Sequence, residues 1–95
     1  MLPDLLDERH VFHLYVVRAP ERDRLQARLR EGGIGTVVHY PLPAHLQPVY
    51  QGLAAPGSLP ITERLAHEVL SLPIYPELTD AEVDAVAAAV REALA

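Results

Sequence analysis

Polar aromatic side chains gather in one stretch of the sequence, residues 37–50, which reads VVHYPLPAHLQPVY. It holds an imidazole next to a phenol, His39 and Tyr40, and a second imidazole, His45. These groups donate and accept hydrogen bonds, so together they could bind a hydroxyl-rich ligand. The prolines among them fix backbone φ angles and lower the entropy lost when the loop becomes ordered. The alternative is that the prolines only direct the chain, with the tyrosines packed on the body of the protein and His45 facing water.

The histidines do not form a predicted metal site. A structural zinc site needs four protein ligands and a catalytic one needs three. His10 and His13 stand three apart on an expected strand, so their side chains face opposite sides. His39 and His45 are six apart, with no cysteine or acidic residue nearby, and His67 is expected to be exposed on a helix. The spacing therefore favours no metal.

Nucleophilic catalysis is not predicted either. The only serines, Ser58 and Ser71, lack the setting of a nucleophile elbow. Cysteine is absent, which excludes thiol chemistry and disulfides, and no glycine pattern for binding phosphate is present. All eight Lys+Arg residues are arginine. We therefore expect neither a complete catalytic apparatus nor a bound cofactor in this sequence alone.

The composition predicts a single globular domain. The chain has 95 residues, of which 49% are hydrophobic and 22% charged. Its formal net charge is −5, and the acidic excess lies in residues 51–95. Arginines concentrate only in residues 18–30, where acidic residues dilute them, so we interpret them as a solvated helix face and expect no nucleic-acid binding. No apolar run could span a membrane, the first residues do not resemble a signal peptide, and the lack of cysteine suits the cytoplasm.

Hydrophobic periodicity, prolines and glycines predict the elements that position the polar stretch. After a lead-in segment, residues 1–9, we expect in turn a strand at 10–18, a helix at 21–32, a strand at 34–40, a long connection at 41–59 with a helical turn near 45–50, a helix at 60–70, a strand at 71–75, and a final helix opened by a capping box of Thr79 and Glu82. This order predicts a small α+β domain, with a three-stranded, mostly antiparallel sheet and helices packed on one side.

Three segments, in this order and separation, resemble one known family. They are HVFHLYVVR (10–18), GIGTVVHYPLPAHLQP (33–48) and EVLSLPIYPELT (68–79). The sequence from residue 10 to residue 92 is similar to the C-terminal part of the DegT/DnrJ/EryC1/StrS aminotransferases, which are pyridoxal-phosphate-dependent sugar aminotransferases. The resemblance implies that residues 10–95 form the small C-terminal domain of a fold type I aminotransferase.

The same resemblance carries expectations about activity. Members of the family usually work as homodimers and transfer an amino group, commonly from glutamate, to a keto-sugar attached to a nucleotide. The strand-to-loop segment of the C-terminal domain contributes side chains near the sugar nucleotide. The resemblance therefore implies that His39, Tyr40 and His45 contact the substrate.

The sequence departs from the family in one respect. In the family a lysine of the large N-terminal domain holds pyridoxal phosphate, whereas this sequence contains no lysine and no such domain. We therefore expect the chain to be inactive alone, as a truncated or split gene product, an isolated domain or a remnant with another role. Its partner would be a cofactor domain or subunit, or a second copy bound through uncovered apolar faces. Two alternatives stay open: a stand-alone binding or dimerisation module that has lost catalysis, and an unrelated regulatory domain of the ferredoxin-like type.

Overall fold

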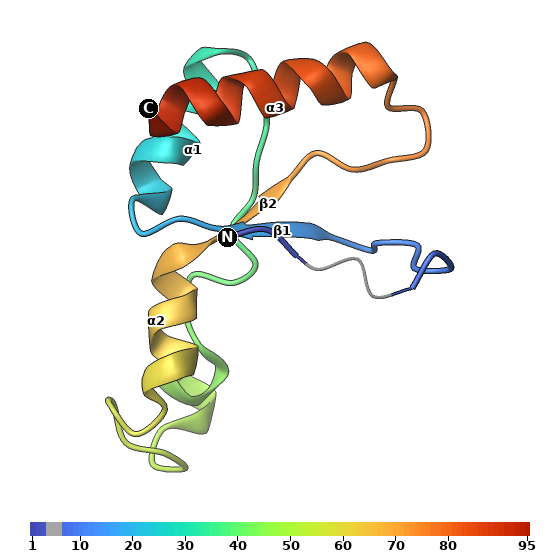
Figure 1. Ribbon diagram of the computed structural model, residues 1–95. Coiled ribbons are helices and arrows are strands. Elements are labelled where there is room, and N and C mark those ends of the chain that lie inside the picture. Colours follow the sequence, from blue (N-terminus) through green and yellow to red (C-terminus); the bar gives the residue numbers. More distant parts are fainter. Residues whose placement is uncertain (4–6) are drawn as a thin grey trace.

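Helices and strands follow one another along the chain in nearly the expected order (Figure 1). The computed structural model describes residues 1–3 and 7–95. Within them the elements are β1 (Tyr15–Arg18), α1 (Arg22–Glu31), the short 3-10 turns η1 (Ala44–Leu46) and η2 (Pro48–Tyr50), α2 (Pro60–Glu68), β2 (Val69–Leu72) and α3 (Asp80–Leu94). Of the lead-in expected at 1–9, residues 4–6 lie outside the described residues.

The sheet has two strands in the described part of the chain, so the prediction of three strands is wrong. Strands β1 and β2 pair antiparallel, from Tyr15 opposite Leu72 to Arg18 opposite Val69, which confirms the α+β class and the antiparallel direction. The segment expected as a strand at 34–40 contributes only one isolated bridge, between Val37 and Ser71. On one side of this bridge the chain bends at His39, and on the other side Pro73 has no N–H to donate to the segment.

The ladder of β1 and β2 ends at Leu72 and at its partner Tyr15. The strand expected at 10–18 is therefore shorter, and the strand expected at 71–75 lies two residues earlier than predicted. Val69 and Leu70, expected at the end of a helix, belong to β2.

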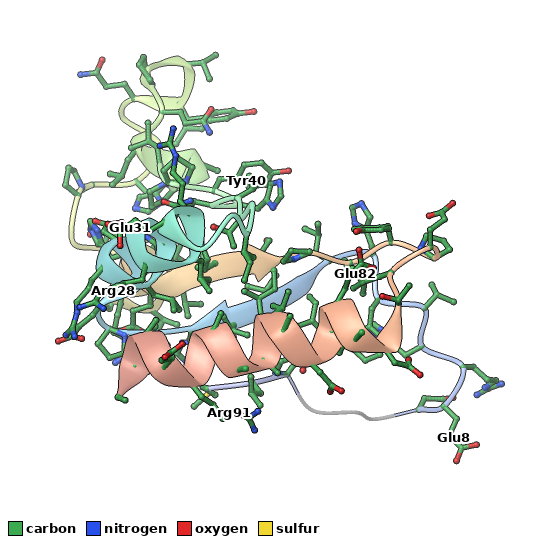
Figure 2. The ribbon with its side chains drawn as sticks, turned by 90° about the horizontal axis from the view of Figure 1, so that it is seen from above. Glu8, Arg28, Glu31, Tyr40, Glu82 and Arg91 are labelled. Atoms are coloured by element: carbon green, nitrogen blue, oxygen red, sulfur yellow. The ribbon has the colours of Figure 1, made fainter. Side chains whose placement is uncertain are left out.

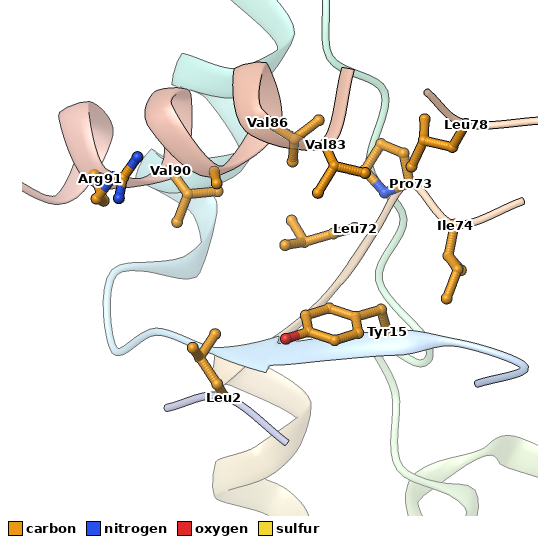
Figure 3. Close-up of a pocket in the computed structure, with 11 residues that line it drawn as sticks. Leu2, Tyr15, Leu72, Pro73, Ile74, Leu78, Val83, Val86, Val90 and Arg91 are labelled. Carbon is orange, nitrogen blue, oxygen red and sulfur yellow. The ribbon is translucent and has the colours of Figure 1, made fainter. Parts of the chain in front are cut away.

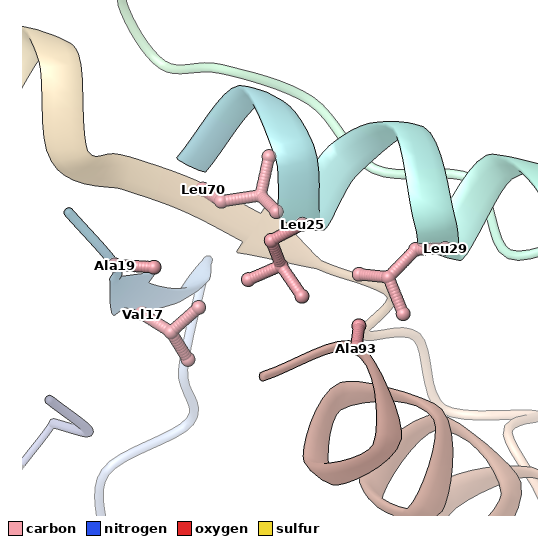
Figure 4. Close-up of a cluster of buried hydrophobic side chains, with 6 residues drawn as sticks. All are labelled: Val17, Ala19, Leu25, Leu29, Leu70 and Ala93. Carbon is pink, nitrogen blue, oxygen red and sulfur yellow. The ribbon is translucent and has the colours of Figure 1, made fainter. Parts of the chain in front are cut away.

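The hydrophobic core lies between the sheet and a layer formed by α1 and α3 (Figure 1). Leu25 and Leu29 lie four residues apart on one face of α1, and both are buried. They meet Val17 of β1, Ala19 just after β1, Leu70 of β2 and Ala93 of α3 (Figure 4). Burying a leucine stabilises the fold by about 1.5–3 kcal/mol, so this cluster fixes α1 on the sheet.

Helix α2 does not join this layer. Together with the connection that precedes it, α2 extends away from the sheet, on the opposite side from α3 (Figure 1). We call residues 41–68 the loop lobe. The expectation that all the helices pack on one side of the sheet is thus met by α1 and α3 and wrong for α2. The polar stretch recognised in the sequence crosses from the sheet into this lobe.

The arginines near α1 do not all lie on a solvated face. Arg24, Arg28 and Arg30 are exposed, as predicted, and Arg28 extends outward from the helix (Figure 2). Arg22 is buried, and its Nη1 donates to the carbonyl oxygens of Ala66 at 3.2 Å and Val69 at 2.9 Å. The interpretation as a solvated face is therefore wrong for Arg22, which ties α1 to the junction of α2 and β2.

Helix α3 begins with the capping box expected from the sequence. Thr79 Oγ1 accepts a hydrogen bond from the Glu82 backbone N–H at 3.3 Å, and Glu82 Oε2 accepts one from the Thr79 N–H at 2.8 Å. These bonds satisfy donors that have no partner within the helix. At 15 residues α3 is the longest helix in the described ranges, and none of the helices there has the length and apolarity to cross a membrane.

Thr79→Ala tests this cap. We expect the substitution to lower the free energy of unfolding by about 1 kcal/mol, because the cap acceptor is lost while the donor remains. Urea denaturation of the 95-residue chain measures the change. Thr62→Ala, on the exposed surface of α2, is the matched control and should have a smaller effect. Equal effects of the two substitutions would show that the box contributes nothing measurable.

Candidate functional site

His39 lies where the chain leaves the sheet. Directly after the Val37–Ser71 bridge the backbone bends at His39, and the imidazole turns back toward β2. Its Nδ1 is 2.9 Å from Oγ of Ser71, a residue that is only 5% exposed. The imidazole is therefore held by a buried hydroxyl, while the ring itself is half-buried. Among the described residues Nε2 of His39 makes no hydrogen bond.

Tyr40 stands beside His39 at the protein surface. The two residues are joined by a cis peptide bond. Their ring centroids are 5.2 Å apart with an interplanar angle of 76°, an edge-to-face arrangement. The two rings are therefore in contact, and they do not point to opposite faces of a strand. Tyr40 is 71% exposed, and Figure 2 shows it at the surface next to the loop lobe. The structure thus presents an imidazole and a phenol side by side.

His45 is not at the surface. It lies in η1, its side chain is 8% exposed, and its Nε2 is 2.9 Å from Oε1 of Glu63 on α2. The alternative in which His45 faces water is therefore wrong. Gly57 donates its backbone N–H to the same carboxylate, at 2.8 and 3.0 Å from the two oxygens. We call His45, Gly57 and Glu63 the loop clamp, because they tie the connection at two points to α2.

Gly57 meets a backbone requirement in the clamp. Its φ is +84°, a conformation that residues with a Cβ rarely adopt, and no other atom approaches the position that a Cβ would take. Glycine is therefore favoured by the backbone angle and not by crowding. The hydrogen bond from His45 is the largest influence that lowers the pKa of the Glu63 carboxyl group below its ordinary value, and the Gly57 N–H acts in the same direction against partial burial.

The clamp predicts a pH-dependent contribution to stability. Because the pKa of Glu63 is lowered on folding, its carboxylate stabilises the fold fully above the ordinary glutamate pKa of about 4.3, and this contribution disappears as the pH falls through the lowered value. Glu63→Gln keeps an acceptor oxygen and removes the charge. We expect the wild-type chain to be more stable than this variant at pH 7 and the difference to shrink between roughly pH 5 and pH 3.

Urea denaturation at several pH values measures this difference. Glu77→Gln, at an exposed position between β2 and α3, serves as the control and should give a smaller difference at pH 7. A difference for Glu63→Gln that stays constant down to pH 3 would contradict a role for its charge.

A separate cavity lies between α3 and the sheet (Figure 3). Its volume is about 420 Å³, and its lining is almost entirely apolar, with Arg91 as the charged exception. The residues that line it are Leu2, Tyr15, Leu72, Pro73, Ile74, Leu78, Val83, Val86, Ala87, Val90 and Arg91. None of the three predicted site residues lines this cavity. It offers packing surface and little hydrogen-bonding chemistry, so we place the candidate site at His39 and Tyr40.

The partners of both histidines, Ser71 for His39 and Glu63 for His45, are not among the residues that the sequence predicts for the site. One signal for Ser71 was available, because a serine between Leu70 and Leu72 on a strand points to the opposite face from the two leucines. Glu63 gave no such signal, since it meets His45 only through the folding of the connection.

The fold indicates the class of protein, because it matches that of aminotransferases of known structure. The structure superposes on the crystal structure of DesV from Streptomyces venezuelae, a ketimine intermediate complex, with a TM-score of 0.88 and 47% sequence identity, covering 96% of this chain and 25% of DesV. The chain belongs to the DegT/DnrJ/EryC1/StrS aminotransferase family, which matches residues 2–91. This confirms the family that the motifs indicated.

Curated relatives support the same family. The chain is 49% identical over 87 residues to a dTDP-3-amino-3,4,6-trideoxy-α-D-glucose transaminase of Streptomyces venezuelae, covering 90% of this chain and 23% of that protein. It is 51% identical over 92 residues to a pleiotropic regulatory protein of Geobacillus stearothermophilus, covering 95% of this chain and 25% of that protein. The chain thus spans about a quarter of the length of the curated relatives it matches.

Proposed function

We propose that this chain is the substrate-contacting C-terminal domain of a nucleotide-sugar aminotransferase that moves an amino group from glutamate to a keto-sugar nucleotide. One observation carries the proposal: nine-tenths of the chain is 49% identical to a transaminase whose name specifies a dTDP-linked amino sugar. The pair of His39 and Tyr40 supports it, because the half-buried imidazole and the 71% exposed phenol lie side by side where a ligand could reach them.

The cofactor of the family does not fit the residues of this chain. Pyridoxal phosphate supplies the electron sink for amino transfer, and a lysine amine holds it covalently. This sequence contains no lysine. Its eight Lys+Arg residues are all arginines, and a guanidinium group does not serve as such an amine. Pyridoxal phosphate would therefore have to be held by residues outside this sequence. For the same reason we propose that the 95-residue chain is inactive alone.

The three predicted site residues receive two different roles in this proposal. His39 and Tyr40 contact the sugar nucleotide directly. His45 already uses Nε2 to bond Glu63, so only its Nδ1 could reach a ligand. We therefore assign His45 first to bracing the connection, and a substrate contact through Nδ1 stays a prediction.

The partner in this proposal is a polypeptide that carries the cofactor, and the complete assembly is a homodimer. Large apolar side chains are uncovered in this chain, among them Val11, Val49 and Leu53, each at least 78% exposed. Exposed apolar surface of this kind favours contact with further polypeptide. Native mass spectrometry of the chain purified from its own cells would identify what it binds.

A chimeric enzyme tests the proposed function directly. Residues 1–95 replace the matching C-terminal quarter of the Streptomyces venezuelae transaminase, which retains its own cofactor-binding part. We expect the chimera to bind pyridoxal phosphate and to transfer the amino group of the dTDP-amino sugar that the relative's name specifies. The unmodified relative and a version cut before the replaced quarter are the positive and negative controls.

A second result would favour the other function. A chimera that folds and binds pyridoxal phosphate, yet transfers no amino group with any of a panel of dTDP- and UDP-linked amino sugars, contradicts the proposal. It would favour a stand-alone binding or dimerisation module, for which the uncovered apolar cavity beside α3 is the observation in support.

A further inference from the structure

Ser71 is a polar residue at a buried position of β2. It is one of two buried polar residues in the described part of the chain, the other being Arg22. Its neighbours on β2, Leu70 and Leu72, face the core, whereas its own side chain faces the other side of the sheet, where His39 lies. Its backbone already exchanges two hydrogen bonds with Val37, so the hydroxyl plays no part in the ladder.

The hydroxyl has one hydrogen-bond partner among the described residues, Nδ1 of His39 at 2.9 Å. A neutral imidazole carries its proton on either Nδ1 or Nε2. With the proton on Nδ1, the ring would donate to Oγ and the hydroxyl hydrogen would be buried without an acceptor, which is unfavourable. With the proton on Nε2, the hydroxyl donates to Nδ1 and every polar group in the contact is satisfied.

We propose that Ser71 is a positioning residue that holds neutral His39 in the Nε2–H form and so makes it a hydrogen-bond donor on the open side of the site. The hydroxyl acts through the imidazole and does not touch the ligand. Nε2 lies across the ring from Ser71 and is left available. An N–H donor fits an acceptor oxygen, so the group that His39 recognises is a phosphate oxygen or a sugar oxygen. This last step rests on the proposed function, whereas the state of the ring does not.

Nuclear magnetic resonance of the 95-residue chain, labelled with ¹⁵N-histidine, tests the state of the ring. The spectra are recorded about two units above the ordinary histidine pKa of about 6.5, and His39→Gln identifies the His39 signals. We expect the Nε2–H pattern, with the Nδ1 resonance shifted by the hydrogen bond relative to that of the exposed His67. The Nδ1–H pattern, or an unshifted Nδ1 resonance, overturns the proposal on the wild-type chain alone.

Variants at Ser71 separate positioning from a general structural role. Ser71→Ala should abolish the shift of Nδ1, and Ser71→Thr, which keeps a hydroxyl, should restore it, with folding checked by circular dichroism. In the chimeric enzyme Ser71→Ala should raise KM for the sugar nucleotide about tenfold, as expected for weakening one hydrogen bond, with a smaller change in kcat, and Ser71→Thr should recover most of the loss. Equal losses for the alanine and threonine variants contradict positioning.

The proposed function and this inference can fail separately. A correct Nε2–H pattern together with a chimera in which His39→Ala leaves turnover unchanged refutes the substrate role of His39 and leaves the positioning by Ser71 intact. An Nδ1–H pattern together with an active chimera refutes the positioning by Ser71 and leaves the proposed function intact.

Discussion

Replacing Arg22 with methionine is expected to lower the free energy of unfolding by about 2–4 kcal/mol. The guanidinium is the donor for the carbonyl oxygens of Ala66 and Val69, and Ala66 lies in the last turn of α2, where carbonyls have no partner within the helix. Methionine preserves much of the apolar stem but donates nothing, so these carbonyls lose their donor where water has little access. Urea denaturation of the 95-residue chain gives the magnitude.

Arg28→Met is the matched control for this experiment. Arg28 is on the same helix, exposed, and extends into solvent (Figure 2). Surface substitutions of this kind usually change stability by less than about 0.5 kcal/mol, apart from a small interaction with the helix dipole. If the two methionine variants were equally stable, the buried guanidinium would not be joining α1 to the junction of α2 and β2.

His39→Ala in the chimeric enzyme is expected to reduce kcat/KM for the sugar nucleotide by about 10–100-fold. The proposed role is a hydrogen bond to an oxygen of the substrate, and a bond of this kind contributes about 1–3 kcal/mol, more when the oxygen is charged. The substitution leaves the cofactor-binding part of the chimera untouched. Steady-state kinetics, together with the absorbance of bound pyridoxal phosphate, separates a loss of substrate contact from a loss of cofactor.

Two further variants of the chimera define the site more closely. Tyr40→Phe removes only the hydroxyl of an exposed ring, so we expect a smaller loss of about 3–10-fold. His67→Ala removes an exposed imidazole on α2 and is the control, with kinetics close to those of the unmodified chimera. If His39→Ala behaved like His67→Ala, the site would be wrongly placed.

Signals between near neighbours predicted the helices well. Leu25 and Leu29, four residues apart, share the buried face of the predicted first helix, and the three-residue spacing of Thr79 and Glu82 identified the start of α3. Both features depend on residues three or four positions apart, which a helix brings together whatever the rest of the fold. The order of elements also predicted a mostly antiparallel sheet, and β1 and β2 pair in this direction.

Strand lengths were predicted poorly because each depends on a distant partner. Residues 10–14 have strand-forming side chains, but the ladder with β2 begins only at Tyr15. Phe12 instead adopts a φ of +46° and donates its N–H to the imidazole of His10. The β-propensity of a segment depends on its own residues and does not show whether a partner strand is present to pair with it.

The polar stretch indicated His39, Tyr40 and His45 as candidate site residues, but their surroundings depend on residues far away in the sequence. Ser71 is 32 positions from His39, and Glu63 is 18 positions from His45. Neither separation corresponds to a helical or strand repeat. The partner of each imidazole, a buried hydroxyl for His39 and a carboxylate for His45, is therefore visible only in the folded structure.

The loop lobe contributes none of the side chains in the core cluster of Val17, Ala19, Leu25, Leu29, Leu70 and Ala93. Substitutions, insertions and deletions in the connection at 41–59 therefore leave the packing between α1, α3 and the sheet unchanged. Natural selection can therefore revise the surface beside His39 and Tyr40 without disturbing this core, provided that the loop clamp is kept. A scaffold divided in this way separates the residues that fix the core from those that shape the exposed connection.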